Sequence, residues 1–413
     1  MLKNRNFVAI PVVTFAMILT TEAAQHNAFK WDELKPICNF AIFLKKLPAA
    51  VQHKAEQAKA AIQAAAEAEI QATMAAYAAA ELNNSIVYAA TASASHSCLT
   101  SALDNLANLY SSGIMASAKA AQTVGHVEEL IGLLKTASAG GGTTAYCLNS
   151  GSADAPTTDT RINGDECTEL EFDTTTAPMV FKGEHIDKSG FKTFKNQDVL
   201  TGQVTKCSLL EKIADGTPHA SDTFQSDGPH NLVQGLLTVT AKSAASHAAT
   251  FTKQDAIASD WVIQKPTDQL QKLYVAIAEA KKAIETQTNC GTDAKSVIKH
   301  VIGDGKTTGE IEKYLKAIYP AEKKDTATND ARTMIDKVAG TSDNQKTKIQ
   351  EQIVSTGATK IQGTTAESKQ LKDISGNDQL QTAFLVQRAE LIEASSSAAK
   401  ACQSQNTAST KIT

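Results

Sequence analysis

Residues 58–82 read AKAAIQAAAEAEIQATMAAYAAAEL, a run of helix-forming residues without glycine or proline. Alanine has the highest helix propensity and buries little area, so this run favours a long helix packed closely against another. The apolar positions before and into the run recur at steps of three or four, which is one helical stripe. They are Ile37, Phe40, Leu44, Leu47, Val51, Ala55, Ala58 and Ile62. We expect a helix over about residues 30–82, kinked at Pro48.

A second apolar stripe follows, with steps of four and three that make a sustained heptad. Its members are Leu99, Leu103, Leu106, Tyr110, Gly113, Ser117, Ala120, Val124, Val127, Ile131 and Leu134. This spacing is typical of a coiled-coil seam, and its small residues allow a partner helix to approach closely. We expect a helix over about residues 97–136 that forms an antiparallel hairpin with the first. Two core helices of an ordinary bundle are the alternative.

The rest of the chain predicts two lobes, one at each end of this hairpin. Residues of about 140–260 carry loop composition, turns at Asp215-Gly216 and Asp227-Gly228-Pro229, and short β-like runs at 179–181 and 232–239. We name this region the top lobe. The other expected parts are a return helix at about 266–288, a bottom lobe at about 291–376, a final helix at about 379–402 and a tail at 403–413. The fold class is therefore mainly α, an elongated helical hairpin and bundle with a loop-and-strand top lobe.

The N-terminus reads as a secretory signal peptide. Lys3 and Arg5 precede an apolar run over residues 7–19, and small residues at Thr21 and Ala23 suit cleavage after Ala23. The run is short for a membrane span, which needs about 20 residues. We expect the first 23 residues to be removed and the mature protein to be secreted.

In a secreted chain, cysteines are expected to form disulfides. There are seven, so one is unpaired or pairs outside this segment. The hairpin would place Cys98, Cys290 and Cys402 near its bottom end, which leaves Cys98–Cys290 and Cys290–Cys402 both open. An N-glycosylation sequon at Asn83 falls at the expected turn between the two long helices.

No motif in the sequence indicates catalysis or metal binding. The segment 303–308 resembles a phosphate-binding loop, but His300 stands where its first glycine is needed. Gly183-Glu184-His185 lacks the second histidine of a zinc hydrolase motif, and His126 is expected to be packed or at a rim. A formal net charge of −4 gives no reason to expect nucleic acid. We expect no enzyme activity, no metal and no cofactor.

Five segments together resemble the N-terminal domain of the trypanosome variant surface glycoproteins, with the A-type cysteine pattern. They are Leu34–Cys38, Leu44–Pro48, the alanine-rich run 58–82, the stretch 118–134 and Tyr146–Leu148. The resemblance covers essentially the whole mature chain in pattern, and it implies that two disulfides staple the top lobe. By order and spacing they would be Cys38–Cys167 and Cys147–Cys207.

The resemblance also implies a function, which is a dense protective coat on the cell surface that supports antigenic variation and immune evasion. Expected partners are a second copy of the chain, in a homodimer, and host antibodies. Family members are normally held by a GPI anchor on the extracellular face, although this segment shows no anchor signal. The alternative is a receptor of the same family that binds a host serum protein. The expected exposed epitope stretch, 149–166, includes Asn149, Asp154, Thr158, Arg161 and Asp165.

Overall fold

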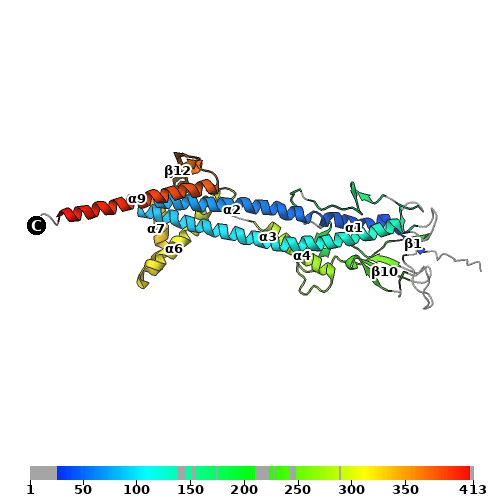
Figure 1. The fold of residues 1–413 in the computed structure, drawn as a ribbon. Helices are drawn as coiled ribbons and strands as arrows, with labels where there is room; N and C mark the ends of the chain where they lie inside the picture. Colours follow the sequence, from blue (N-terminus) through cyan, green and yellow to red (C-terminus); the bar gives the residue numbers. More distant parts are fainter. Residues whose placement is uncertain are drawn as a thin grey trace, which may run out of the picture.

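The protein is described here by a computed structural model. It covers residues 26–137, 146–150, 155–157, 159–173, 175–181, 183–205, 207, 209, 223–224, 226, 228–241, 248–287 and 290–409. The expected signal peptide and the turn residues Asp215 and Asp227 lie outside these ranges. The described chain is an elongated helical bundle with a strand-containing lobe at one end and a helical lobe at the other (Figure 1). The expected fold class is confirmed.

Three helices make the rod of the molecule, namely α1 (Trp31–Leu44), α2 (Leu47–Ala78) and α3 (Leu82–Thr136). The first long helix is therefore two helices, separated at Lys45 and Lys46. Pro48 falls in the first turn of α2, where a helix has no use for the missing amide hydrogen, and it starts a helix instead of kinking one. α3 then runs back alongside α2 (Figure 1).

The expected start of the second helix near residue 97 is wrong, because α3 begins at Leu82. The turn lies over residues 79–81, and Ser85 Oγ donates a hydrogen bond to the Ala76 carbonyl across it at 2.9 Å. Serine and threonine are common in the first part of α3, although their hydroxyls can favour turns over helices. Their hydroxyls instead bond to carbonyls of their own helix, as Thr91 does to Val87 at 2.8 Å.

The buried positions of α3 recur every eleven residues, not every seven. Five positions at this spacing are each at most 2% exposed, and they are Val87, Cys98, Leu109, Ala120 and Ile131. Eleven residues in three turns is 3.67 per turn, close to the α-helical value, so the stripe hardly drifts around the helix. The long hairpin therefore keeps one face of α3 against α2 along its whole length.

The expected heptad matches this buried stripe only in the upper part of α3. From Gly113 onward the two patterns share most positions, whereas Leu103 and Tyr110 are exposed and their neighbours Ala102 and Leu109 are buried. Leu103 and Tyr110 were therefore wrongly expected at the helix contact, and the residues that are buried there precede each of them by one position. At Gly113 an added Cβ would lie 2.6 Å from Val51 Cγ1, so glycine permits the close approach of α2 here.

The top lobe combines two small sheets and two hairpins with α1 and the end of α3. In one sheet β1 (His26–Lys30) lies between β2 (Leu148–Asn149) and β8 (Leu200–Thr205). The other has the order β7 (Gln197–Asp198), β11 (Ala248–Phe251), β10 (Leu237–Thr240) and β9 (His230–Leu232). The hairpins are β3 (Arg161–Ile162) with β4 (Asp165–Glu166), and β5 (Ile186–Asp187) with β6 (Gly190–Phe191).

Two expected β-like runs differ from this arrangement. The run 232–239 is interrupted by η2 (Val233–Gly235), because Val233 and Gln234 adopt left-handed backbone angles. The run 179–181 forms no strand, and of its three side chains Phe181 is the one that is buried in the core.

The return helix α4 (Gln269–Glu285) packs along α3, and the bottom lobe follows it. Its elements are α5 (Ala294–Gly303), α6 (Lys306–Ile318), η3 (Ala321–Thr326), α7 (Ala327–Ala339), α8 (Gln345–Val354), β12 (Gly357–Gln362), β13 (Thr365–Gln370) and η4 (Leu371–Asp373).

The final helix α9 (Asn377–Ser409) packs beside α2 and continues past the hairpin, away from the top lobe (Figure 1). It extends beyond the expected end at 402, so most of the expected tail is helical. Within the described residues, no helix has the length and apolar character needed to cross a bilayer.

Candidate functional site

Two disulfides fasten the top lobe to the rod. Cys38 of α1 bonds to Cys167, directly after β4, and Cys147 bonds to Cys207. These are the two pairs that the resemblance implied, and all four cysteines are at most 1% exposed. Both bridges lie where α1 begins and α3 ends, so they hold the lobe against that end of the hairpin.

The third bridge joins Cys98 to Cys290, one of the two pairings that the sequence left open. Cys98 lies well inside α3, not at its start as expected. The side chain of Cys402 lies outside the described part of the chain.

Ion pairs add a second attachment for the hairpin β3–β4. Lys45, in the break between α1 and α2, is 8% exposed and lies 2.7 Å from Asp165. Lys135, in the last turn of α3, lies 3.2 Å from Glu166. Because both lysines belong to the rod, the two acidic residues of β4 attach the hairpin to the break between α1 and α2 and to the end of α3.

The environment of Glu166 keeps this carboxylate charged. Burial alone would raise its pKa, but hydrogen bonds from Thr160, Lys135 and Thr168, with the charge of Lys135, hold the pKa below its usual value. A carboxylate with a lowered pKa stabilises the fold above its unfolded-state pKa and loses that contribution as the pH falls through the lowered value. At neutral pH Glu166 is therefore charged and can pair with Lys135.

Of the expected epitope residues, one is buried and another is half-buried. Asn149 is 3% exposed because it pairs with Lys30 in the sheet, and this expectation was wrong. Asp165 is half-buried by Lys45. Arg161 is exposed, whereas Asp154 and Thr158 lie outside the described residues.

The exposed tip of this region is a tight turn at Asn163 and Gly164. Both residues have positive φ, of 53° and 98°, which is the backbone that a two-residue hairpin loop requires. Asn-Gly is the usual signal for such a turn, so the sequence could have revealed this tip.

A half-buried histidine lies in the top lobe, next to the end of α1. His185 packs its ring 5.0 Å from that of Phe43, and its Nδ1 lies 3.0 Å from Thr193 Oγ1. Burial lowers the pKa of His185, and this outweighs the opposing charge of Glu184. The folded protein therefore resists protonation at this position more than the unfolded chain does.

We expect stability to fall as the pH drops through about 6.5, the pKa of an unfolded histidine, because the unfolded state then binds more protons. The variant His185→Gln should have a flatter dependence of the urea midpoint on pH between 7.5 and 5.5. His126→Gln, at an exposed position, is the matched control and should keep the wild-type slope. Equal slopes in the wild type and His185→Gln would contradict the assignment.

A stripe of exposed apolar side chains lies on α3 at mid-rod. Leu103, Tyr110 and Ile114 are 46%, 48% and 67% exposed, and their spacing of seven and four places them on one helix face. Met115 is also exposed but lines the groove between α3 and α4. The positions of the eleven-residue pattern, such as Leu109, face α2 and are buried. The three residues of the stripe lie on another face of α3 and are left uncovered.

The remaining candidates have structural explanations. The segment 303–308 spans the end of α5, a two-residue turn and the start of α6, where Gly305 has φ of 74° and Thr307 is buried beside Thr91. His126 is exposed at the rim of an apolar groove.

Asn83 is half-buried in the first turn of α3 and not in a turn between helices, so its glycosylation stays a prediction. Across the described side chains, no three potential metal ligands gather in one place.

Comparisons with known proteins agree with this architecture. A family model described as trypanosome variant surface glycoprotein (A-type) matches residues 10–387. The fold is similar to the solved structure of MITat 1.1, with a TM-score of 0.63 and 13% identity over 91% of this chain and 100% of that chain. The solved structure of variant surface glycoprotein VSG13 gives a TM-score of 0.44 and 15% identity, over 88% and 99% of the two chains. No curated protein matches the sequence.

Proposed function

The chain belongs to the A-type trypanosome variant surface glycoprotein family, a family of surface coat proteins, and from that premise we propose how it is arranged in the coat. The top lobe faces outward and the end that carries α9 faces the membrane, where a GPI anchor attaches the protein. One observation carries this proposal, which is that α9 leaves the bundle at the end opposite the top lobe (Figure 1). A narrow rod in this orientation packs densely and exposes its tip.

The turn of the hairpin β3–β4 is exposed and lies next to the residues that anchor the hairpin. Asn163 and Gly164 are exposed, whereas Asp165 and Glu166 beside them hold the hairpin to the rod. Surface loops on a rigid scaffold tolerate sequence change. Variation at exposed hairpin residues such as Arg161 would leave the anchoring residues in place, whereas positive φ at Asn163 and Gly164 limits which residues fit the turn.

Limited trypsin digestion compares the two ends of the rod in intact cells and in purified protein. Arg161 of the hairpin β3–β4, exposed in the top lobe, should be cleaved in both samples. Lys316 and Lys323 of the bottom lobe, both exposed in the single chain, should be cleaved only in the purified protein because neighbouring molecules cover them in the coat. Cleavage at the two lysines before Arg161 on intact cells would overturn the proposed orientation.

The proposal includes a homodimer formed through the exposed stripe of α3. Leu103, Tyr110 and Ile114 are apolar, lie on one face and are uncovered in the single chain. Exposed apolar groups in a row along a helix are the pattern that a second helix can bury. A second copy of the chain offers the same stripe, which suits the self-complementary interface of a two-fold dimer.

The double variant Tyr110→Asp/Ile114→Asp should shift the protein from dimer to monomer, because each carboxylate would be buried without a partner in the interface. Light scattering coupled to size exclusion, over a range of protein concentrations, measures the change. Met115→Asp places the same charge in the groove between α3 and α4 and should leave the dimer intact. A double variant as dimeric as the wild type would place the interface elsewhere.

The same premise supports the expectation that the protein acts as a structural coat component and not as an enzyme. Its family is one of coat proteins. The family's receptor-like alternative finds no supporting feature among the described residues, so we propose only the coat role.

A further inference from the structure

The disulfide Cys98–Cys290 differs from the other two bridges in exposure and charge. The four cysteines of the top lobe are fully buried, whereas Cys290 is partly exposed at the edge of the bottom lobe. Its partner Cys98 is 2% exposed on the inner face of α3. Cys290 is therefore the more exposed of the two residues of this bridge.

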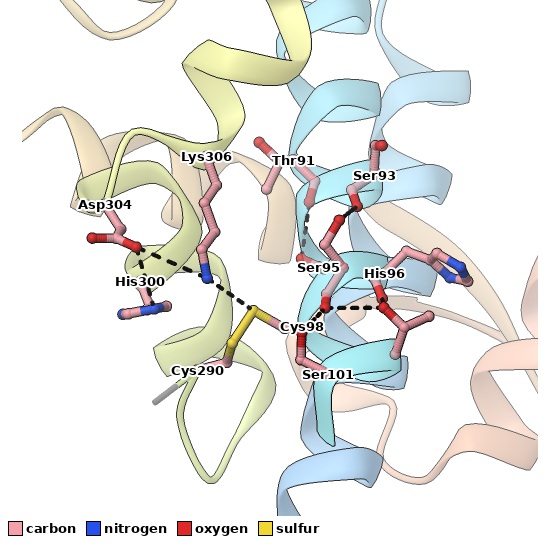
Figure 2. The surroundings of a disulfide bond; sticks show 12 residues. Thr91, Ser93, Ser95, His96, Cys98, Ser101, Cys290, His300, Asp304 and Lys306 are labelled. Carbon is pink, nitrogen blue, oxygen red and sulfur yellow. Dashed lines mark hydrogen bonds and ion pairs between the residues drawn. A yellow bond between two sulfur atoms is a disulfide. The ribbon is translucent and has the colours of Figure 1, made fainter. Parts of the chain in front are cut away.

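A lysine lies beside the buried sulfur. Lys306, the first residue of α6, places Nζ 3.9 Å from Cys98 Sγ, and Figure 2 shows its side chain extended toward this atom. Asp304 Oδ2 lies 3.9 Å from both Lys306 Nζ and His300 Nε2, so the lysine is oriented without a close ion pair. An ammonium group at this distance stabilises negative charge that develops on a sulfur atom.

We propose that Cys98–Cys290 is a thiol–disulfide exchange site for low-molecular-weight thiols, attacked at Cys290 and assisted by Lys306. The thiolate of the small thiol bonds to Cys290 Sγ while the bond between the two protein sulfurs breaks, and Cys98 leaves as a thiolate beside Lys306. A second small thiolate attacks the small-thiol sulfur of this mixed disulfide and releases Cys290 as a thiolate. The two small thiols are oxidised to their disulfide, and the protein bridge is reduced.

Opening the bridge would loosen the bottom lobe without unfolding it. Among the described disulfides, this is the one that ties the bottom lobe to the rod, and it joins residues 192 apart in sequence. An apolar core formed with the rod, which includes Val87, Ile298 and Ile353, would still hold the lobe in place. The exchange therefore changes how firmly the bottom lobe is attached.

The test follows reduction of the full chain by dithiothreitol, with alkylation of free thiols and peptide mass spectrometry at successive times. Cys98–Cys290 should open before the top-lobe bridges. Lys306→Met should slow its opening on the order of tenfold, as expected for losing one charge contact to the leaving group. Lys316→Met removes a lysine about 15 Å further along α6 and should keep the wild-type rate.

A second measurement identifies the attacked sulfur and does not depend on the variants. Incubation with reduced glutathione, quenched with acid, should give a glutathione adduct on Cys290 and a free thiol at Cys98. Adducts mainly on Cys98, a Lys306→Met rate equal to that of the wild type, or earlier opening of the top-lobe bridges would each overturn the proposal. Circular dichroism of each variant shows that the comparison is between folded proteins.

Discussion

Replacing Phe40 with alanine is expected to destabilise the top lobe by about 3–5 kcal/mol, the usual cost of deleting a buried aromatic ring. Phe40 of α1 is fully buried, and its ring lies edge-on to Phe191 at 5.1 Å and to Phe194 at 5.2 Å. Phe191 in turn meets Tyr274 of α4 at 5.5 Å. This one ring therefore joins α1, the short strands and the return helix.

Hydrogen exchange resolved by segment measures the effect, because a chain of this size can open one lobe at a time. The top lobe of Phe40→Ala should exchange much faster, while α5–α8 should keep the wild-type rates. Phe384→Ala is the matched control, since Phe384 is partly buried at the other end beside Tyr77. Equal exchange of the top lobe in the two variants would show that Phe40 is not central to its core.

The aromatic core explains how strands as short as those of the top lobe can be stable. Most strands of the top lobe have only two to four residues, too few for a sheet to stand alone. They are held by packing on α1 and α4 and by two disulfides. The packing and disulfides that hold these strands therefore involve few of the exposed residues of the top lobe.

The rod could be predicted from the sequence because its signal is local. An alanine-rich run without glycine or proline specifies a helix by propensity, and the periodic stripes specify which face is buried. The period itself was misread, since heptad and eleven-residue patterns share many positions above Gly113 and separate below it. The exposure of Leu103 and the burial of Ala102 decide between the two patterns. Burial depends on how distant segments pack together, which the local sequence does not specify.

The attachment of the tip could not be predicted from spacing. Lys45 and Asp165 are 120 residues apart, and neither has a local pattern that points to the other. Asn149 lies in a strand of two residues, too short for any alternation, and it is buried only because β1 pairs alongside it. Both errors concern residues whose surroundings come from distant segments.

Removing the bridge between Cys38 and Cys167 is the second large expected effect. The double variant Cys38→Ser/Cys167→Ser should lose about 2–5 kcal/mol, because the bridge closes a long loop that the unfolded chain would otherwise explore freely. The cysteines are 129 residues apart, and Cys167 directly follows the ion-paired strand β4. The hairpin β3–β4 would then keep its ion pairs with Lys45 and Lys135 and the packing of Ile162 against the core.

The location of the loss separates this bridge from the one in the bottom lobe. Cys38→Ser/Cys167→Ser should speed hydrogen exchange in β3, β4 and α1 and leave α5 unchanged. Cys98→Ser/Cys290→Ser should do the reverse, because its bridge joins α3 to the start of the bottom lobe. If both double variants loosened both ends equally, the rod would couple the lobes, and the tip could not vary independently of the attached end. Separate losses would mean that the outer lobe has its own covalent support, which is what a coat protein with a variable tip requires.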